Sequence, residues 1–206
     1  MSQRAHEAGW IERTRAAGKA WLEAAARPLA RILLRLNVSP NVVTLLALAL
    51  SIVAAWLIVA GQPVAGALVF LAAGALDLLD GTLARLGRLD SRVGAFLDST
   101  LDRVSEGVVF TALAAVFASN SQPVETALTM LALLASVLVS YARARAEALG
   151  AACAVGLATR GERVVLLVLG LVTGLVVEAL ALILVLSAIT VVQRIRHTAR
   201  ELAARE

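Results

Sequence analysis

The stretch LDLLDGTLARLGRLDSRVGAFLDSTLDR, residues 76–103, places charged side chains between two long apolar runs. It contains five aspartates, although 60% of the whole chain is hydrophobic; they are Asp77, Asp80, Asp90, Asp98 and Asp102. Carboxylates in apolar surroundings cost free energy unless they are paired or bind a ligand. The spacing of these residues, set in an otherwise apolar chain, decides both the fold and the function that the sequence predicts.

The composition indicates a membrane protein. Only 17% of the residues are charged and the mean hydropathy is +0.84, whereas about a quarter of the residues of a typical soluble domain are charged. The chain has predominantly apolar runs at 42–60, 64–76, 104–118, 127–139, 164–177 and 179–192. Because a span needs about 20 residues, the shorter runs need their flanks, and the second and third runs extend into the acidic stretch. We therefore expect an all-α membrane protein with six transmembrane helices; the alternative is a soluble helical bundle.

The basic residues are distributed on one side of these runs. All 19 Lys and Arg residues lie before the first run, around the second and fourth connections, or after the sixth run. The other connections, "GQP" at 61–63, "ASNSQPVET" at 118–126 and a turn near Glu178, have none. The positive-inside rule then places both termini and both basic connections in the cytoplasm. We expect a multi-pass protein of the cell membrane whose active site faces the cytoplasm.

Residues 1–36 form a separate N-terminal segment. Tryptophans and aliphatic residues recur there at helical spacing among basic residues: Trp10, Ile11, Trp21, Leu22, Leu29, Ile32, Leu33 and Leu36. This pattern predicts an amphipathic helix on the cytoplasmic membrane surface, with an ordinary solvated helix as the alternative. "NVSPN" at 37–41 ends this helix, and Pro40 can begin the first span. The predicted domains are the amphipathic helix, 1–36, and a six-helix domain, 37–206.

The chain lacks the residues that several common kinds of catalytic site require. Cys153 is the single cysteine, so it cannot form a disulfide within the chain or build a thiolate metal site. His6 and His197 lie near opposite ends, which leaves little material for a zinc site or a Ser-His-Asp triad. The sequence also has no glycine-rich phosphate loop followed by Lys-Ser or Lys-Thr.

The aspartates are paired at helical spacing. Asp77 and Asp80 are three residues apart, and Asp98 and Asp102 are four apart, so each pair shares one face of its helix. The short connection 85–91 joins the two helices, which allows the acidic faces to meet. Carboxylates gathered in this way favour Mg²⁺ or Mn²⁺, which suits chemistry on the phosphate ester of a lipid alcohol. The alternative is a network of structural ion pairs with Arg85, Arg92 and Arg103.

Eight residues of this stretch match a family signature. Asp77-x-x-Asp80-Gly81-x-x-Ala84-Arg85, then eight residues, then Gly94-x-x-x-Asp98-x-x-x-Asp102, resembles the motif of the CDP-alcohol phosphotransferases at every position. The resemblance implies that the hydroxyl of a second substrate displaces CMP from a CDP-linked lipid. It implies that the four aspartates hold two metal ions, Mg²⁺ or alternatively Mn²⁺, and that Asp102 is the general base. It also implies contacts to the CDP-lipid from Asn41, Val42, Val43, Thr44, Gly81, Ala84, Arg85 and Ser91. Family members are commonly homodimers, so a homodimer is expected, without a nucleic-acid partner.

Three further segments bear on the acceptor. "SYARARAEALG" at 140–150, "RGER" at 160–163 and "VVQR" at 191–194 resemble the phosphatidylinositol phosphate synthases and their archaeal ether-lipid counterparts. The resemblance implies that the phosphate of inositol phosphate is bound by Arg143, Arg163 and Arg194; simple anchoring at the membrane face is the alternative for these residues. Arg143 stands where the bacterial enzymes usually carry lysine, and Gly161 replaces a proline.

The predicted reaction transfers a phosphatidyl group from CDP-diacylglycerol to inositol 1-phosphate and releases CMP. Three alternatives stay open at this point. A phosphatidylglycerol phosphate synthase would use glycerol 3-phosphate as the acceptor. An archaetidylinositol phosphate synthase would use CDP-archaeol as the donor. A transporter would also place carboxylates within spans, but it would not need a metal cage.

Overall fold

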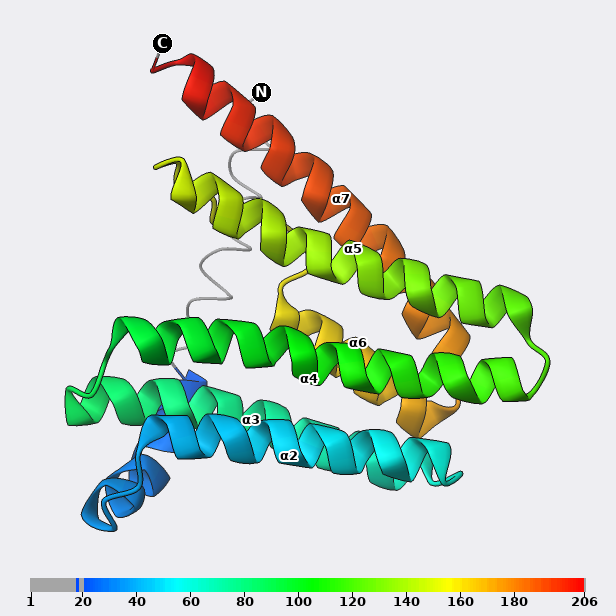
Figure 1. The fold of residues 1–206 in the computed structure, drawn as a ribbon, viewed down its shortest axis with the longest axis horizontal. Coiled ribbons are helices and arrows are strands. Elements are labelled where there is room, and N and C mark those ends of the chain that lie inside the picture. The colour runs from blue at the N-terminus through cyan, green and yellow to red at the C-terminus, as the bar shows by residue number, and fades with distance from the viewer. Residues whose placement is uncertain (1–17, 19–20, 206) are drawn as a thin grey trace. The chain divides into compact units, whose positions relative to one another are not determined.

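The chain folds into α-helices throughout its described part. The computed structural model describes residue 18 and residues 21–205, and no strand occurs among them. A helical stretch at 21–35 precedes six longer helices. They are α2 (Pro40–Val59), α3 (Pro63–Gly87), α4 (Arg92–Ser119), α5 (Pro123–Ala148), α6 (Arg160–Thr173) and α7 (Val176–Ala203), as Figure 1 shows. The predicted all-α class is confirmed.

Four of these helices, α2, α3, α5 and α7, are long and apolar enough to cross a membrane. Helix α6 has 14 residues and is therefore about 21 Å long at 1.5 Å per residue, less than the roughly 30 Å of a bilayer's hydrocarbon core. Helix α4 carries Asp98, Asp102 and Glu106 between its start and its middle. A membrane protein with several spans is supported, and a count of six stays a prediction.

Helix starts and turns follow local chemistry. Pro40, Pro63 and Pro123 each begin a helix, where a missing backbone N–H costs no hydrogen bond. The expected turn near Glu178 is wrong, because α6 already ends at Thr173 and Gly174 adopts a left-handed φ of 80°. Glu178 instead lies in the first turn of α7, where an acidic side chain interacts favourably with the helix dipole.

The chain divides into two compact units. Among the described residues, the first unit comprises those up to 47 and 75–101, and the second comprises 48–74 and 102–205. In the first unit, the stretch 21–35 packs on the start of α2 and the end of α3, through a buried cluster of Ala30, Val43, Leu79 and Leu83. Trp21, Leu29 and Ile32 of the same stretch remain exposed. Exposed apolar side chains suit a helix that lies on a membrane, which stays a prediction; Trp10 and Ile11 lie outside the described residues.

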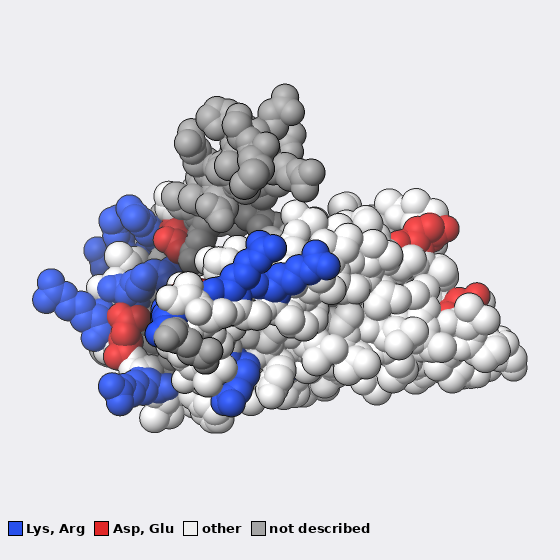
Figure 2. Space-filling model, turned by 90° about the horizontal axis from the view of Figure 1, so that it is seen from above, with Lys and Arg blue, Asp and Glu red and all other residues white. Residues whose placement is uncertain are grey.

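The second unit has the larger apolar core. Helices α5 and α6 both pack against α7, and the core includes Phe70, Phe110, Leu167, Leu180 and Ile183. Many large apolar side chains of the helices are exposed, among them Leu131, Leu169 and Val185. Such exposure is expected where lipid rather than water covers a surface. On the face drawn in Figure 2, the Lys and Arg side chains lie in the left and central part of the view, and a broad area of uncharged residues adjoins them on the right.

Candidate active site

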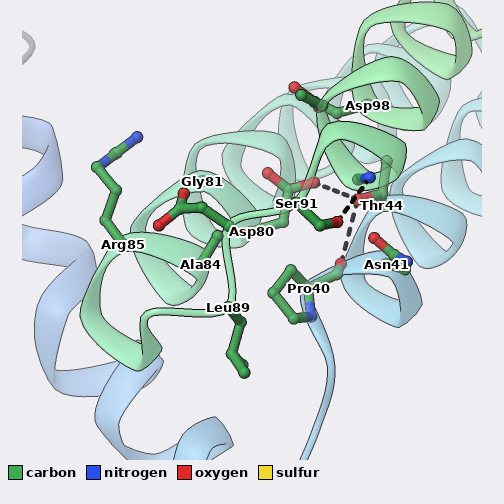
Figure 3. Close-up of a pocket in the computed structure, with 13 residues that line it drawn as sticks. Pro40, Asn41, Thr44, Asp80, Gly81, Ala84, Arg85, Leu89, Ser91 and Asp98 are labelled. Atoms are coloured by element: carbon green, nitrogen blue, oxygen red, sulfur yellow. Dashed lines mark hydrogen bonds between the residues drawn. The ribbon is translucent and has the colours of Figure 1, made fainter.

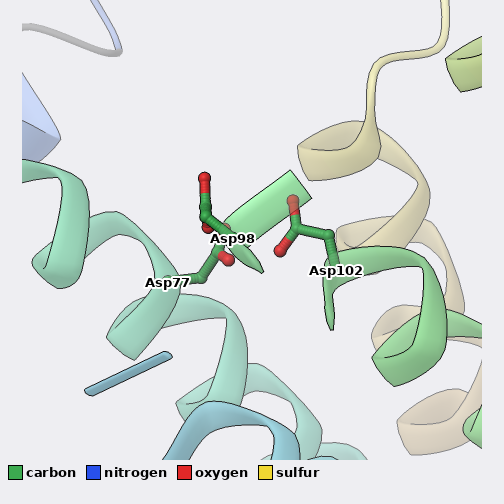
Figure 4. Close-up of side chains that lie close together, drawn as sticks. All are labelled: Asp77, Asp98 and Asp102. Carbon is green, nitrogen blue, oxygen red and sulfur yellow. The ribbon is translucent and has the colours of Figure 1, made fainter. Parts of the chain in front are cut away.

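Three of the predicted metal ligands form a group of carboxylates. Asp77 on α3 and Asp98 on α4, both in the first unit, offer oxygens within 4.8 Å of each other. Asp102 begins the second unit, but the unbroken helix α4 carries it one turn beyond Asp98 and thereby fixes its place beside that residue. Figure 4 shows these side chains. A set of oxygen donors at this spacing could hold a hard divalent cation such as Mg²⁺ or Mn²⁺.

Asp80, the fourth predicted ligand, has different surroundings. Its side chain is buried, and its Oδ2 accepts a 2.6 Å hydrogen bond from the hydroxyl of Thr44. The same hydroxyl lies 3.1 Å from the carbonyl oxygen of Pro40. Asp80 is thus tied to the start of α2, and it lines a pocket with Asp98.

This pocket lies within the first unit and has a volume of about 210 Å³. Six residues that the sequence predicts as donor contacts line it, as do several neighbours (Figure 3). The predicted contacts are Asn41, Thr44, Gly81, Ala84, Arg85 and Ser91. Val42 and Val43, predicted with them, do not line it, since Val42 is exposed and Val43 is buried in the apolar cluster. The arrangement gives a polar cavity whose wall includes Asp80 and Asp98.

Two features shape the pocket wall. The backbone N–H of Gly94 donates to the Oγ of Ser91 over 2.9 Å, so Ser91 caps the N-terminus of α4. A Cβ on Gly94 would lie 3.0 Å from that Oγ and 3.3 Å from Oδ1 of Asn41, closer than most side chains approach. Glycine therefore keeps this part of the pocket open.

Arg85 pairs with Glu23, a residue that the sequence did not predict as part of the site. Its guanidinium lies 2.9 Å from a carboxylate oxygen of Glu23, on the helical stretch 21–35. The Arg85 side chain is about half exposed, and ion pairs in contact with water are weak and easily exchanged. Arg85 can therefore turn from Glu23 to an anionic ligand at low cost. No sequence signal links positions 23 and 85.

The predicted acceptor arginines lie in the second unit with unequal exposure. The side chain of Arg143 is 55% exposed and pairs with Glu147 over 2.8 Å. Arg163 is buried, and Arg194 is buried with its guanidinium donating to the carbonyl oxygens of Val139 and Val155. Val139 lies one turn before Arg143 on α5, so the guanidinium of Arg194 contacts the helix that carries Arg143.

The buried Arg163 is held by Glu106, which the sequence reasoning also missed. Nε and one terminal nitrogen of Arg163 donate to the two oxygens of Glu106 over 2.7 and 2.8 Å, and the other donates to the carbonyl oxygen of Ala158. Glu106 lies one turn after Asp102, inside the predicted span 104–118. An ionisable residue within a span marks a candidate functional position by default, and that signal was available in the sequence.

Asp102 also has a cationic partner that was not predicted. A terminal nitrogen of Arg160, the first residue of α6, lies 2.7 Å from Oδ1 of Asp102. A terminal nitrogen of Arg103 lies 3.9 Å from Oδ2 of Asp102. The predicted general base therefore forms an ion pair in this structure.

Comparisons with known proteins show what the chain is similar to. Residues 37–195 match the family model of the CDP-alcohol phosphatidyltransferases. An archaetidylinositol phosphate synthase of Pyrococcus horikoshii is 36% identical over 85% of this chain and 93% of its own length. A phosphatidylinositol phosphate synthase of Corynebacterium glutamicum is 34% identical over 87% of this chain and 86% of its own.

A solved structure is also similar. The phosphatidylinositol phosphate synthase of Mycobacterium tuberculosis, crystallised with CDP-DAG bound, has a TM-score of 0.78 and 34% identity over 84% of this chain and 92% of that one. The same enzyme has been crystallised in complex with manganese and citrate.

Proposed function

Because the chain belongs to the CDP-alcohol phosphatidyltransferase family, we propose that this enzyme transfers a phosphatidyl group from CDP-diacylglycerol to inositol 1-phosphate. The products are phosphatidylinositol phosphate and CMP. One observation carries the proposal: Asp77, Asp98 and Asp102 form a carboxylate group, and Asp98 also lines the pocket that gathers most of the predicted donor contacts. The relatives of this chain include synthases of phosphatidylinositol phosphate and of archaetidylinositol phosphate.

The donor would bind in the pocket of the first unit. Gly81 and Gly94 leave room for a diphosphate, and Arg85 supplies a positive charge once it leaves Glu23. Asn41, Thr44 and Ser91 offer hydrogen-bonding groups to the nucleotide. Val42 and Val43, at the same segment, belong to the predicted donor set through the resemblance alone.

The carboxylates would hold the metal, with Asp77, Asp80, Asp98 and Asp102 as the proposed ligands of two Mg²⁺ ions. A bound divalent cation neutralises the diphosphate and stabilises the charge on departing CMP. Asp102 takes the proton from the acceptor hydroxyl, whose oxygen forms the new bond to phosphorus as the bond to the CMP oxygen breaks. Asp80, fixed by Thr44, keeps a carboxylate directed into the pocket.

The acceptor phosphate would be bound by Arg143, Arg163 and Arg194. Arg163 and Arg194 both donate to carbonyl oxygens of the segment 155–158, and Arg194 also donates to Val139 on α5, the helix that carries Arg143, which supports one anion site. Arg143 is the accessible member, because Arg163 and Arg194 are buried and already donate to Glu106 and to backbone carbonyls. We expect Arg143 to make the exchangeable contact to phosphate, while the two buried arginines supply a fixed positive field.

Replacement of Arg143 by alanine should raise the Michaelis constant for inositol 1-phosphate by about one to two orders of magnitude, the value of a charge-assisted phosphate contact. The constant for the CDP-lipid should stay nearly unchanged. Arg143→Lys should retain most of the affinity, because a charge remains. CMP release measured against inositol 1-phosphate, glycerol 3-phosphate, free inositol and serine tests the acceptor at the same time.

Several outcomes would contradict this assignment. Glycerol 3-phosphate as the best acceptor would indicate a phosphatidylglycerol phosphate synthase, and equal use of free inositol would remove the phosphate site. If both Michaelis constants rose together in Arg143→Ala, the arginine would act as a membrane anchor. A parallel series with CDP-archaeol tests the archaetidylinositol alternative, and absence of CMP release with every donor would favour a transporter.

We also propose six spans in the cell membrane, an amphipathic helix over 1–36 and a six-helix domain over 37–206, with both termini and the active site cytoplasmic. The one-sided placement of all 19 Lys and Arg residues supports this orientation. Cysteines introduced at Gln62 and Gln122 should react with an impermeant thiol reagent added outside intact cells, and one at Arg88 should not. Reaction at Arg88 would reverse the orientation. A homodimer is proposed from the family resemblance, and light scattering of the purified protein in detergent would measure its mass.

A further inference from the structure

Two ion pairs join α4 to the first turn of α6 within the second unit. Asp102 and Glu106 are one turn apart on α4, and Arg160 and Arg163 are one turn apart on α6. Asp102 pairs with Arg160, which we call the outer pair, and Glu106 pairs with Arg163, which we call the inner pair. The two helices therefore meet through matched charges at successive turns.

The two pairs differ in burial and geometry. The inner pair is bidentate, and its side chains are only 1% and 5% exposed. In the outer pair a terminal nitrogen of Arg160 lies 2.7 Å from Oδ1 of Asp102, and the side chains are 22% and 15% exposed. A buried bidentate pair is costly to break, whereas an ion pair that water can reach exchanges more readily. We therefore expect the inner pair to persist and the outer pair to exchange its ionic partners.

The start of α6 also has an anchor that is independent of Asp102. Thr159 caps the helix, and its backbone N–H donates to the carboxylate of Glu162 over 2.6 Å, which completes a capping box. With the capping box and the inner pair in place, the side chain of Arg160 can leave Asp102 without unwinding the helix.

We propose that Arg160 is an exchangeable counter-ion of Asp102, which a divalent cation displaces when it binds the carboxylate group. The inference rests on the proposed metal site. While the guanidinium of Arg160 lies 2.7 Å from Oδ1 of Asp102, this oxygen is less able to coordinate a metal ion or to accept a proton. Arg160 thus keeps the clustered carboxylates compensated in the absence of metal, and it releases Asp102 for the reaction when metal is present.

A permanent positioning role would have the opposite signature. If Arg160 held Asp102 in place in both states, its removal would misorient a ligand and weaken metal binding. If Arg160 competes with the metal, its removal strengthens metal binding. The sign of the change separates the two roles.

The test measures Mn²⁺ binding to the purified full-length protein in detergent, without substrates, from the electron paramagnetic resonance signal of free Mn²⁺. We expect Arg160→Gln to bind Mn²⁺ about tenfold more tightly, since a competing charge-assisted contact is lost. Arg160→Lys should stay near the wild-type affinity. Arg103→Gln is the matched control, because it also removes a positive charge near Asp102 but one that lies 3.9 Å away, and its shift should be smaller.

A second measurement uses the unmodified chain. Modification of arginines by phenylglyoxal, followed by mass spectrometry, should increase at Arg160 when Mn²⁺ is added and stay low at the buried Arg163. Unchanged or weaker Mn²⁺ binding in Arg160→Gln, or no increase in Arg160 modification, would overturn the inference while leaving the metal site intact. Failure of the wild type to bind Mn²⁺, or equal binding by Asp98→Asn, would instead overturn the proposed metal site and the inference with it.

Discussion

Replacement of Asp102 by asparagine should lower turnover by about 10²–10⁴-fold, the usual contribution of a general base. The amide cannot accept the proton of the acceptor hydroxyl, although its oxygen can still face a metal ion. Donor and metal binding should therefore decline less than turnover does. Asp98→Asn should lose binding as well as turnover, because Asp98 belongs both to the carboxylate group and to the wall of the donor pocket. Initial rates of CMP release, together with Mn²⁺ binding, measure the two effects separately.

Glu178→Gln provides the control for this pair of variants. Glu178 is an exposed carboxylate in the first turn of α7 and belongs to none of the proposed sites. Its loss should leave CMP release near the wild-type rate. Turnover in Asp102→Asn within a few fold of the wild type would show that the proton is taken elsewhere, and the assignment of Asp102 as the base would then be wrong.

The helices could be predicted from the sequence because apolar runs and proline positions act locally. Pro40 begins α2 as predicted, and the second and third apolar runs extend into the acidic stretch as predicted, since α3 ends at Gly87 and α4 begins at Arg92. The failure came at the boundary between α6 and α7. Apolar residues continue through that turn, so hydropathy alone missed the break that Gly174 makes with its positive φ.

The candidate site likewise has features that could be predicted from the sequence and features that could not. The spacing of Asp98 and Asp102 predicts a shared helix face, because a single helix fixes both residues. The partners Glu106 and Arg163 are 57 positions apart, and Glu23 and Arg85 are 62 apart. Sequence spacing carries no information about pairings that tertiary packing creates. For the same reason, the burial of Arg163 and Arg194 could not be predicted from the sequence.

The inner ion pair leads to the second large effect, which is on stability. Glu106→Gln should lower the free energy of unfolding by about 3–5 kcal/mol, because it leaves the buried guanidinium of Arg163 without a compensating charge. Arg163→Ala should cost a similar amount by leaving the carboxylate of Glu106 unpaired. Equilibrium unfolding of the purified protein in detergent measures both variants. Glu147→Gln is the matched control, since it removes the acidic partner of the exposed Arg143, and its cost should stay below about 1 kcal/mol.

The double variant Glu106→Leu with Arg163→Met shows what the pair contributes. Replacing a buried ion pair by apolar side chains of similar volume is often neutral or stabilising, so this variant should recover most of the lost stability. Activity should not recover with stability, because the proposed acceptor site loses one of its three arginines. The ion pair between α4 and α6 is lost as well. Recovery of both stability and the wild-type Michaelis constant for inositol 1-phosphate would mean that Arg163 only supports the fold. Recovery of stability alone would mean that the inner pair is retained for the acceptor site, at a position where apolar packing would have served the fold equally well.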